Sequence, residues 1–200
     1  GGWTAWDLVS WYNGHPDLSD AVLDLSSVRR GVVVGSGNVS LDVARILCSP
    51  VERLASTDIS DRALRQLRAS AVEEVLVLGR RGAAQGSFTP PELREFCSLD
   101  GVTVSAEGLE AGRPTEPDAT QVRLLSLLDG LGPRPTAPCG RQVAFRFCSS
   151  VVRFEGQERL EAVQIIGNRL EQQGERVVAR PTGSPERLSA ELVVQAIGYK

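Results

Sequence analysis

The 200-residue sequence has no excess of basic residues and no long apolar run. Its formal net charge is −3 at pH 7, whereas nucleic-acid-binding surfaces are basic, so the composition argues against DNA or RNA as a partner. No apolar stretch reaches the roughly 20 residues that a membrane-spanning helix requires. The hydrophobic share of 42% instead predicts a globular domain with room for one core.

The sequence also lacks the patterns of a zinc site or a disulfide framework. Its cysteines are scattered without a CxxC pair, at Cys48, Cys97, Cys139 and Cys148, and His15 is the only histidine. We therefore predict no structural metal and reduced, partly buried thiols, which favours a reducing compartment. The chain begins without methionine or a leader segment, so we expect it to come from a longer protein. The mitochondrial matrix and the bacterial cytoplasm are both compatible with these features.

The pattern of apolar residues predicts an α/β unit followed by a β-rich part. Helical spacing covers residues 3–12, 39–47, 60–69, a segment opened by Pro90 and Pro91, and 121–128. Buried strands are expected at 31–35 and 74–79, and further strands at 143–154, 160–167, 175–180 and 190–197. Because polar and apolar residues alternate in the later strands, we expect these to form an antiparallel extension of the βαβ core.

A glycine-rich turn joins the first buried strand to the next helix in the segment VVVGSGNVSLDVAR, residues 32–45. In a dinucleotide-binding turn of this kind, Gly35 permits the sharp bend and Gly37 lets the backbone approach a pyrophosphate. The helix that begins near Asn38 presents free N–H groups and its positive dipole end to that anion. Ser40 replaces the third glycine of the fingerprint and is small enough to keep helix and strand close. The turn therefore predicts nucleotide binding, with a plain strand-to-helix turn as the alternative.

The acidic residue that usually follows such a turn after about 20 positions is missing. In NAD-binding proteins this carboxylate accepts hydrogen bonds from the adenosine ribose. Here the second strand ends at Gly79-Arg80-Arg81, which is 79 − 35 = 44 residues after Gly35, and the helix at 60–69 fills the extra distance. Two guanidinium groups at this place can bind a 2′-phosphate through forked, charge-assisted hydrogen bonds. The pair predicts NADP(H) rather than NAD(H), although two arginines after a strand can also form a solvated corner.

Four stretches together resemble the NADP-binding domain of the adrenodoxin-type ferredoxin–NADP+ reductases, flavoproteins related to glutathione reductase. They are WYNGHPDLS, GSGNVSLDVARIL, GRRGAAQGSFTPPELREF and the closing AIGYK. The similarity runs in register over residues 3–96 and returns at 190–200. It implies a Rossmann-like, three-layer α/β fold of the two-dinucleotide-binding-domain flavoprotein superfamily. The whole chain would be one NADP-binding domain, with an entry segment at 1–30, the glycine turn and arginine pair at 31–100, and a β-rich remainder at 101–200.

The resemblance assigns nucleotide-binding roles to residues of these stretches. The NADP pyrophosphate would lie along the glycine turn, formed by Gly35, Ser36, Gly37, Asn38 and Val39. Arg80 and Arg81 would bind the 2′-phosphate, and Glu92 would contact the nucleotide near its ribose. From the residues alone, Glu92 is better explained as a first-turn carboxylate that the helix dipole favours.

The resemblance also implies a partner. Members of the family dock an acidic [2Fe–2S] protein, a ferredoxin or adrenodoxin, on a basic surface of this domain. Arg94 lies at a matching position, and Arg123 is a second candidate, but the neighbouring stretch PDATQV lacks the further basic residues expected there. We expect the protein to be a monomer.

Three smaller expectations concern residues outside these roles. Asp42 and Arg45 are three positions apart on the helix at 39–47 and are expected to pair on its surface. His15, which precedes a proline in a loop, is expected to be a hydrogen-bonded structural residue rather than a proton donor. The tryptophans near the start of the chain are expected to pack at the edge of the domain.

The chain contains one glycine fingerprint, whereas the family has a second one that binds FAD. The resemblance therefore implies a parent enzyme that passes a hydride from NADPH to FAD and then single electrons to the iron–sulfur protein. This chain alone would hold the nucleotide and be inactive. Two other interpretations remain open: a domain of a flavoprotein like the small subunit of glutamate synthase, and a catalytically silent NADPH-sensing domain.

Overall fold

The molecule contains two β-sheets of different kinds. The computed structural model describes residues 2–18, 21–132, 140–174 and 176–198. Within these ranges the strands of a parallel sheet lie in the order β1 (Trp3–Thr4), β9 (Leu192–Gln195), β2 (Arg30–Val34), β3 (Glu74–Leu78), β5 (Arg141–Arg146) and β4 (Val102–Glu107). A second sheet is antiparallel and consists of β6 (Ser149–Glu155), β7 (Ala162–Gln173) and β8 (Arg176–Ser189).

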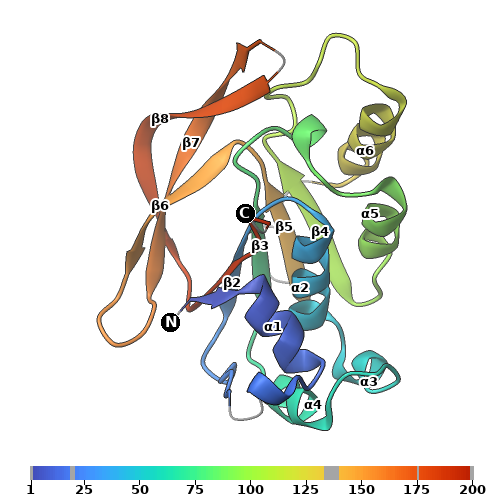
Figure 1. Ribbon diagram of the computed structural model, residues 1–200, viewed down its shortest axis with the longest axis vertical. Coiled ribbons are helices and arrows are strands. Elements are labelled where there is room, and N and C mark those ends of the chain that lie inside the picture. Colours follow the sequence, from blue (N-terminus) through green and yellow to red (C-terminus); the bar gives the residue numbers. More distant parts are fainter. Residues whose placement is uncertain (1, 19–20, 133–139, 175, 199–200) are drawn as a thin grey trace.

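Helices form the third layer, against the face of the parallel sheet that the antiparallel sheet leaves uncovered (Figure 1). They are α1 (Ala5–Tyr12), α2 (Asn38–Cys48), α3 (Val51–Leu54), α4 (Asp61–Arg68), α5 (Pro90–Cys97) and α6 (Ala119–Asp129), with 3-10 turns at Pro16–Leu18 and Ala83–Gln85. This arrangement of helices, parallel sheet and antiparallel sheet confirms the predicted three-layer α/β fold with an antiparallel extension.

The central strands are mainly apolar because both of their faces are covered. Every residue of β3 is buried. Val75 and Val77 belong to the core shared with the helices, and Leu76 belongs to a second core shared with Val163 and Ile165 of β7. The antiparallel sheet therefore packs on the parallel one through a hydrophobic layer of its own.

A cluster of phenylalanines fixes the segment before α5 to the sheet. The ring of Phe145 on β5 meets Phe88 edge-on at a centroid distance of 5.6 Å and Phe96 of α5 at 5.9 Å. All three side chains are buried. Such edge-to-face pairs add about 0.5–1.5 kcal/mol each beyond the burial of apolar area. The segment that leads into α5 is thus held firmly beside the parallel sheet.

The prediction of a single strand at 143–154 is wrong. The chain leaves the parallel sheet after Arg146 and enters the antiparallel sheet at Ser149, so two strands of two different sheets replace one. Between them, Cys148 has φ 52°, the left-handed conformation that turns the chain. The sequence does not mark this turn, because neither glycine nor proline occurs between residues 141 and 155.

The segment predicted at 190–197 does not join the antiparallel extension either. Its strand, β9, pairs in parallel with β1 and β2 and completes the main sheet. The first helix begins at Ala5 rather than at residue 3, since Trp3 and Thr4 form β1. The strand β4 was missed, because its residues alternate without a strongly apolar face: Ser105 alone among them is buried.

The other predicted helices are confirmed within one or two residues, and the smaller expectations are tested as well. Trp11 is buried and meets Trp3 edge-on at 6.3 Å, as expected of packing at the domain edge, but the side chain of Trp6 is 56% exposed. The Nδ1 atom of His15 accepts a hydrogen bond from the N–H of Asp17 at 3.3 Å, which agrees with a structural role.

The thiols in the described residues are free. Cys48 and Cys148 are buried and Cys97 is half-buried, whereas Cys139 lies outside the described residues, as do Tyr199 and Lys200 of the AIGYK stretch. Burial raises the pKa of Cys48 to about 12 and that of Cys97 to about 11. No cluster of metal ligands occurs in the described ranges, and none of the helices there combines the length and hydropathy needed to span a bilayer.

Candidate nucleotide-binding site

The glycine turn and the arginine pair lie side by side at the carboxyl edge of the parallel sheet. Strands β2 and β3 are neighbours, with Val34 in register with Leu78. The N–H of Gly35 donates to the carbonyl of Leu78 at 2.9 Å. A Cβ atom added to Gly79 would lie 3.3 Å from the Cβ of Ser36. The two sequence signals, 44 positions apart, therefore meet in one place.

The two glycines of the turn are required for different reasons. Gly35 has φ +138°, and a Cβ there would lie 2.3 Å from the carbonyl oxygen of Ala196. The fold itself thus demands glycine at this position. Gly37 has an ordinary extended φ of −137°, and a Cβ there would meet Ser87 at a normal contact distance of 3.6 Å. Neither backbone conformation nor packing explains glycine at position 37.

The N-terminus of α2 lacks the usual compensation for its dipole. Gly37 is the N-cap and supplies no side-chain hydrogen bond, and the first turn contains no acidic residue. By contrast, Thr4 and Asp118 form capping boxes on α1 and α6. Since the end of a helix carries roughly half a positive charge, this N-terminus favours an anion. Ser40 is fully buried beneath Gly35, as expected of a small replacement for glycine.

Hydrogen bonds tie the glycine turn to the segment before α5. The Oδ1 atom of Asn38 accepts from the N–H of Thr89 at 2.8 Å, and its Nδ2 atom donates to the Thr89 Oγ1 atom at 3.4 Å. The N–H of Ser87 donates to the carbonyl of Ser36 at 2.7 Å. Because Thr89 is the N-cap of α5, these contacts bring the N-termini of two helices together. The roles of Ser87 and Thr89 were missed, although Thr before Pro-Pro is a recognisable helix start.

The side chains of the arginine pair have no recorded ion-pair partner among the described residues. Arg80 is exposed and Arg81 is half-buried. Their main-chain carbonyls are bonded, however, to Asn168 and Cys148 respectively. The backbone of the pair is therefore fixed while its guanidinium groups are available to a ligand.

Glu92 belongs to an ion-pair network that joins α2 to α5. The Nη1 atom of Arg45 lies 3.0 Å from Oδ1 of Asp42, which confirms the predicted pair, and its Nη2 atom lies 3.6 Å from Oε2 of Glu92. Burial raises the pKa of Asp42, Arg45 opposes the rise, and Glu92 and Glu95 add to it. The side chain of Glu92 is 44% exposed, so it can still reach a ligand.

Arg94 and Arg123 lie on neighbouring helices. Arg94 is on α5 and Arg123 on α6, both are exposed, and the two helices pack against each other. The structure thus brings the two predicted docking residues onto adjacent elements.

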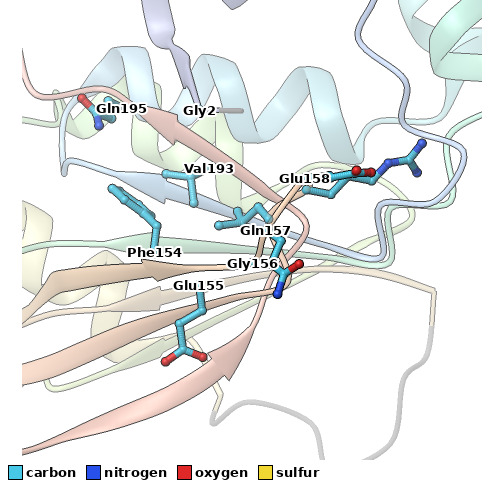
Figure 2. A pocket seen from close by; sticks show the side chains of 10 residues that line it. Gly2, Phe154, Glu155, Gly156, Gln157, Glu158, Val193 and Gln195 are labelled. Atoms are coloured by element: carbon cyan, nitrogen blue, oxygen red, sulfur yellow. The ribbon is translucent and has the colours of Figure 1, made fainter.

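A cavity of about 440 Å³ lies between the β6–β7 hairpin and β9 (Figure 2). Phe154, Leu160 and Val193 provide its apolar lining, and the Phe154 side chain is 51% exposed. None of the predicted site residues lines this cavity. It is therefore not part of the candidate nucleotide site.

No protein-family model matches the chain, but curated relatives do. The NADPH-ferredoxin reductase FprA of Mycobacterium tuberculosis is 42% identical over 200 residues, which cover 97% of this chain and 44% of the relative. The mitochondrial NADPH:adrenodoxin oxidoreductase of Arabidopsis thaliana is 34% identical over 213 residues, which cover 99% of this chain and 44% of the relative. The chain thus spans about 44% of the length of these curated relatives.

A solved structure supports the same similarity. The structure of Mycobacterium tuberculosis FprA in complex with NADPH matches with a TM-score of 0.90 and 41% identity. The match covers 98% of this chain and 44% of that chain. Both a bacterial and a mitochondrial protein are thus among the relatives.

Proposed function

We propose that this chain, a homologue of the NADPH-ferredoxin and NADPH:adrenodoxin reductases, is the NADP(H)-binding domain of such an enzyme. The resemblance predicted from four stretches of the sequence is confirmed by identities of 34% and 42% with these proteins. The single observation that carries the proposal is the glycine at position 37. The fold does not require it, yet it stands at an uncapped helix N-terminus beside two arginines.

The residues of the turn fit a dinucleotide. Its pyrophosphate would lie along Gly35 to Val39, where a side chain at Gly37 would occupy the space that the phosphates need. The positive end of α2 would stabilise the negative charge. Gly35 would keep the turn tight, and Asn38 would hold it against Thr89.

Selection between the two nicotinamide nucleotides is assigned to Arg80 and Arg81. A 2′-phosphate is the chemical difference between NADPH and NADH, and guanidinium groups bind phosphate through paired, charge-assisted hydrogen bonds. Glu92 would contact the nucleotide near its ribose, held in place by Arg45.

NADPH supplies a hydride when it is bound, and FAD in another part of the enzyme would receive it. The residues of this chain bind and orient the nucleotide and carry out no chemical step themselves. The 200 residues thus act as one nucleotide-binding domain and, on their own, are expected to be inactive and monomeric.

The partner proposed to receive the electrons is an acidic [2Fe–2S] ferredoxin or adrenodoxin. Arg94 and Arg123 would attract it, since both are exposed cations and lie on neighbouring helices. Arg94→Glu should weaken the binding of a [2Fe–2S] ferredoxin to this chain, more so at low salt than at high salt. Arg153→Glu, on the antiparallel sheet, is the control of equal charge change. Equal weakening by both variants would contradict this assignment.

The two alternative functions make different predictions. An NADPH-sensing domain would bind NADPH without binding a ferredoxin. A flavoprotein like the small subunit of glutamate synthase would also bind NADPH but would not need the exposed Arg94. Ferredoxin binding that depends on Arg94 therefore favours the reductase.

Isothermal titration of the chain with NADPH and with NADH tests nucleotide binding directly. NADPH should bind at least about 100-fold more tightly than NADH, because each hydrogen bond to a charged group contributes about 1.5–3 kcal/mol. Gly37→Val should weaken the binding of both nucleotides by the same factor, about tenfold or more. Gly132→Val is the control, since a Cβ there would meet no described atom within 4 Å. If the unaltered chain binds neither nucleotide, the glycine turn is only a turn.

A further inference from the structure

The antiparallel sheet holds the backbone of the arginine pair. The carbonyl oxygens of three consecutive residues accept hydrogen bonds from it or from its junction with β5. The carbonyl of Gly79 accepts from the N–H of Ser149 at 3.0 Å, and that of Arg81 accepts from the N–H of Cys148 at 3.0 Å. Between them, the Arg80 carbonyl accepts from the side-chain Nδ2 of Asn168, on β7, at 2.9 Å.

Asn168 is a buried polar side chain whose hydrogen-bonding capacity is only partly used. It is 7% exposed, and its Nδ2 atom donates both to the Arg80 carbonyl and to the Oγ atom of Ser150, at 2.8 Å. Its Oδ1 atom is buried and has no hydrogen-bond partner among the described residues. A buried unpaired acceptor costs stability, so an apolar residue would serve the packing of β7 better. The amide is thus explained by what it holds and not by the stability of the sheet.

The junction beside Asn168 also carries a local cost. Cys148 adopts φ 52°, which is unfavourable for a residue other than glycine. In this conformation its N–H reaches the Arg81 carbonyl, and its own carbonyl accepts the N–H of Asn168 at 2.6 Å. Two unfavourable features, the turned cysteine and the unpaired amide oxygen, therefore lie at the same place, directly behind the arginines.

The side chain of Leu170, on the same face of β7 as Asn168, packs close to the same backbone. A Cβ atom added to Gly82, the residue after the pair, would lie 3.3 Å from Cδ1 of Leu170 and 2.3 Å from the Ala111 carbonyl oxygen. Leu170 is two residues after Asn168 and so lies on the same face of the strand. Hydrogen bonds from β7 and from the junction between β5 and β6, together with packing from Leu170, thus converge on residues 79–82.

We propose that Asn168 is a positioning residue that sets the specificity of the site for a 2′-phosphorylated nucleotide, by fixing Arg80 from behind. This inference rests on the proposed function of the arginine pair. A guanidinium at the end of a long side chain binds a phosphate strongly only when its backbone is already fixed. Otherwise binding must also order that backbone, which costs conformational free energy.

The geometry predicts that the effect is selective. The glycine turn is held by Leu78, Ser87 and Thr89, and none of its recorded hydrogen bonds comes from the antiparallel sheet. The pyrophosphate that NADPH and NADH share would therefore not be affected by a change at Asn168. The loss should fall on the 2′-phosphate, which NADPH alone carries.

The test measures the affinities of the chain for NADPH and NADH by calorimetry in Asn168→Leu, which keeps the size of the side chain and removes the donor. Affinity for NADPH should fall about threefold to tenfold, and affinity for NADH should stay unchanged. Ser150→Ala is the matched control, because it removes the other acceptor of Nδ2 and leaves the bond to Arg80. Asn168→Asp provides a second variant of unchanged size that cannot donate to the carbonyl.

Amide hydrogen exchange adds a readout that needs no nucleotide. Asn168→Leu should speed exchange at Cys148 and Ser149, whose N–H groups bind the carbonyls on either side of Arg80, and should leave the amide of Gly35 unchanged. Equal loss of NADPH and NADH affinity, or no loss of either, would overturn the positioning role while the proposed function stands. An unaltered chain that binds neither nucleotide would overturn both.

Discussion

The glycine turn and the arginine pair are neighbours in space but are held by different parts of the chain. The glycine turn is held by residues 78–89, which run from the end of β3 to the N-cap of α5 and lie in the first half of the chain. The arginine pair is held by residues 146–170, which belong to β5, the antiparallel sheet and the turn between them. The part of the site that would bind what all dinucleotides share is thus local, and the part that would tell them apart depends on a distant addition to the fold.

Affinity for both nucleotides and preference for NADPH therefore depend on different parts of the chain. Damage to the turn should affect NADPH and NADH together, whereas damage to the support of the arginines should affect NADPH alone. Each variant below is expected to fall on one side of this division.

The largest effect is expected at Gly35, where both the conformation and the packing forbid a side chain. Gly35→Ala should lower the free energy of unfolding by about 2–6 kcal/mol, from backbone strain and from the clash with the Ala196 carbonyl. Gly37→Ala should stay within about 1 kcal/mol of the unaltered chain, because its extended backbone accepts alanine. Urea unfolding followed by circular dichroism measures both values. Similar losses for the two variants would remove the distinction between a structural and a ligand-facing glycine.

An intermediate effect is expected at Asn38, which ties the turn to Thr89. Asn38→Ala should cost about 0.5–1.5 kcal/mol of stability and weaken NADPH and NADH by similar factors, in contrast to Asn168→Leu. Asn13→Ala is a matched control, since Asn13 makes one side-chain hydrogen bond of 2.9 Å to the end of α1. Calorimetric titration with both nucleotides measures these factors. A loss of NADPH affinity alone in Asn38→Ala would contradict the prediction.

The smallest effect concerns the acid stability of the antiparallel sheet. Glu155 on β6 accepts hydrogen bonds from Arg187 at 2.7 Å and from Gln164 at 2.6 Å, and these bonds lower its pKa below the usual 4.5. A lowered pKa contributes stability that is present above the unfolded-state value and is lost as the pH falls through the folded-state value. The melting temperature of Glu155→Gln should therefore be lower than that of the unaltered chain at neutral pH. The gap should narrow below about pH 4.5, and a gap that stays constant with pH would contradict the assignment.

The local half of the site could be predicted from the sequence, and the distant half could not. The strand, glycines and helix at 32–45 stand in one continuous pattern, and the arginines follow a strand that is apolar after its first residue. By contrast, the support by Asn168 depends on the turn at Cys148, where a residue without turn character adopts φ 52° inside a stretch that the sequence pattern predicts as one strand. Sequence periodicity does not reveal that β5 and β6 belong to different sheets or that β9 returns to the first one.

The resemblance to a known family supplied what periodicity could not. Glu92 has no distinctive sequence surroundings beyond the start of a helix, and its role near the ribose stays a prediction. The structure adds Arg45, whose contacts to both Asp42 and Glu92 join two helices. A pair three positions apart was predictable from helix geometry, but the third partner on α5 was not.

Recognition of the 2′-phosphate by Arg80 and Arg81 can be measured through the ratio of the NADPH and NADH affinities in their double alanine variant. We expect Arg80→Ala with Arg81→Ala to weaken NADPH by about 100-fold or more and to leave the weak binding of NADH nearly unchanged. Arg153→Ala with Arg159→Ala removes the same charge from exposed positions around the β6–β7 hairpin and should change neither affinity. If the first variant instead loses NADPH and NADH affinity in equal proportion, the two arginines do not recognise the 2′-phosphate.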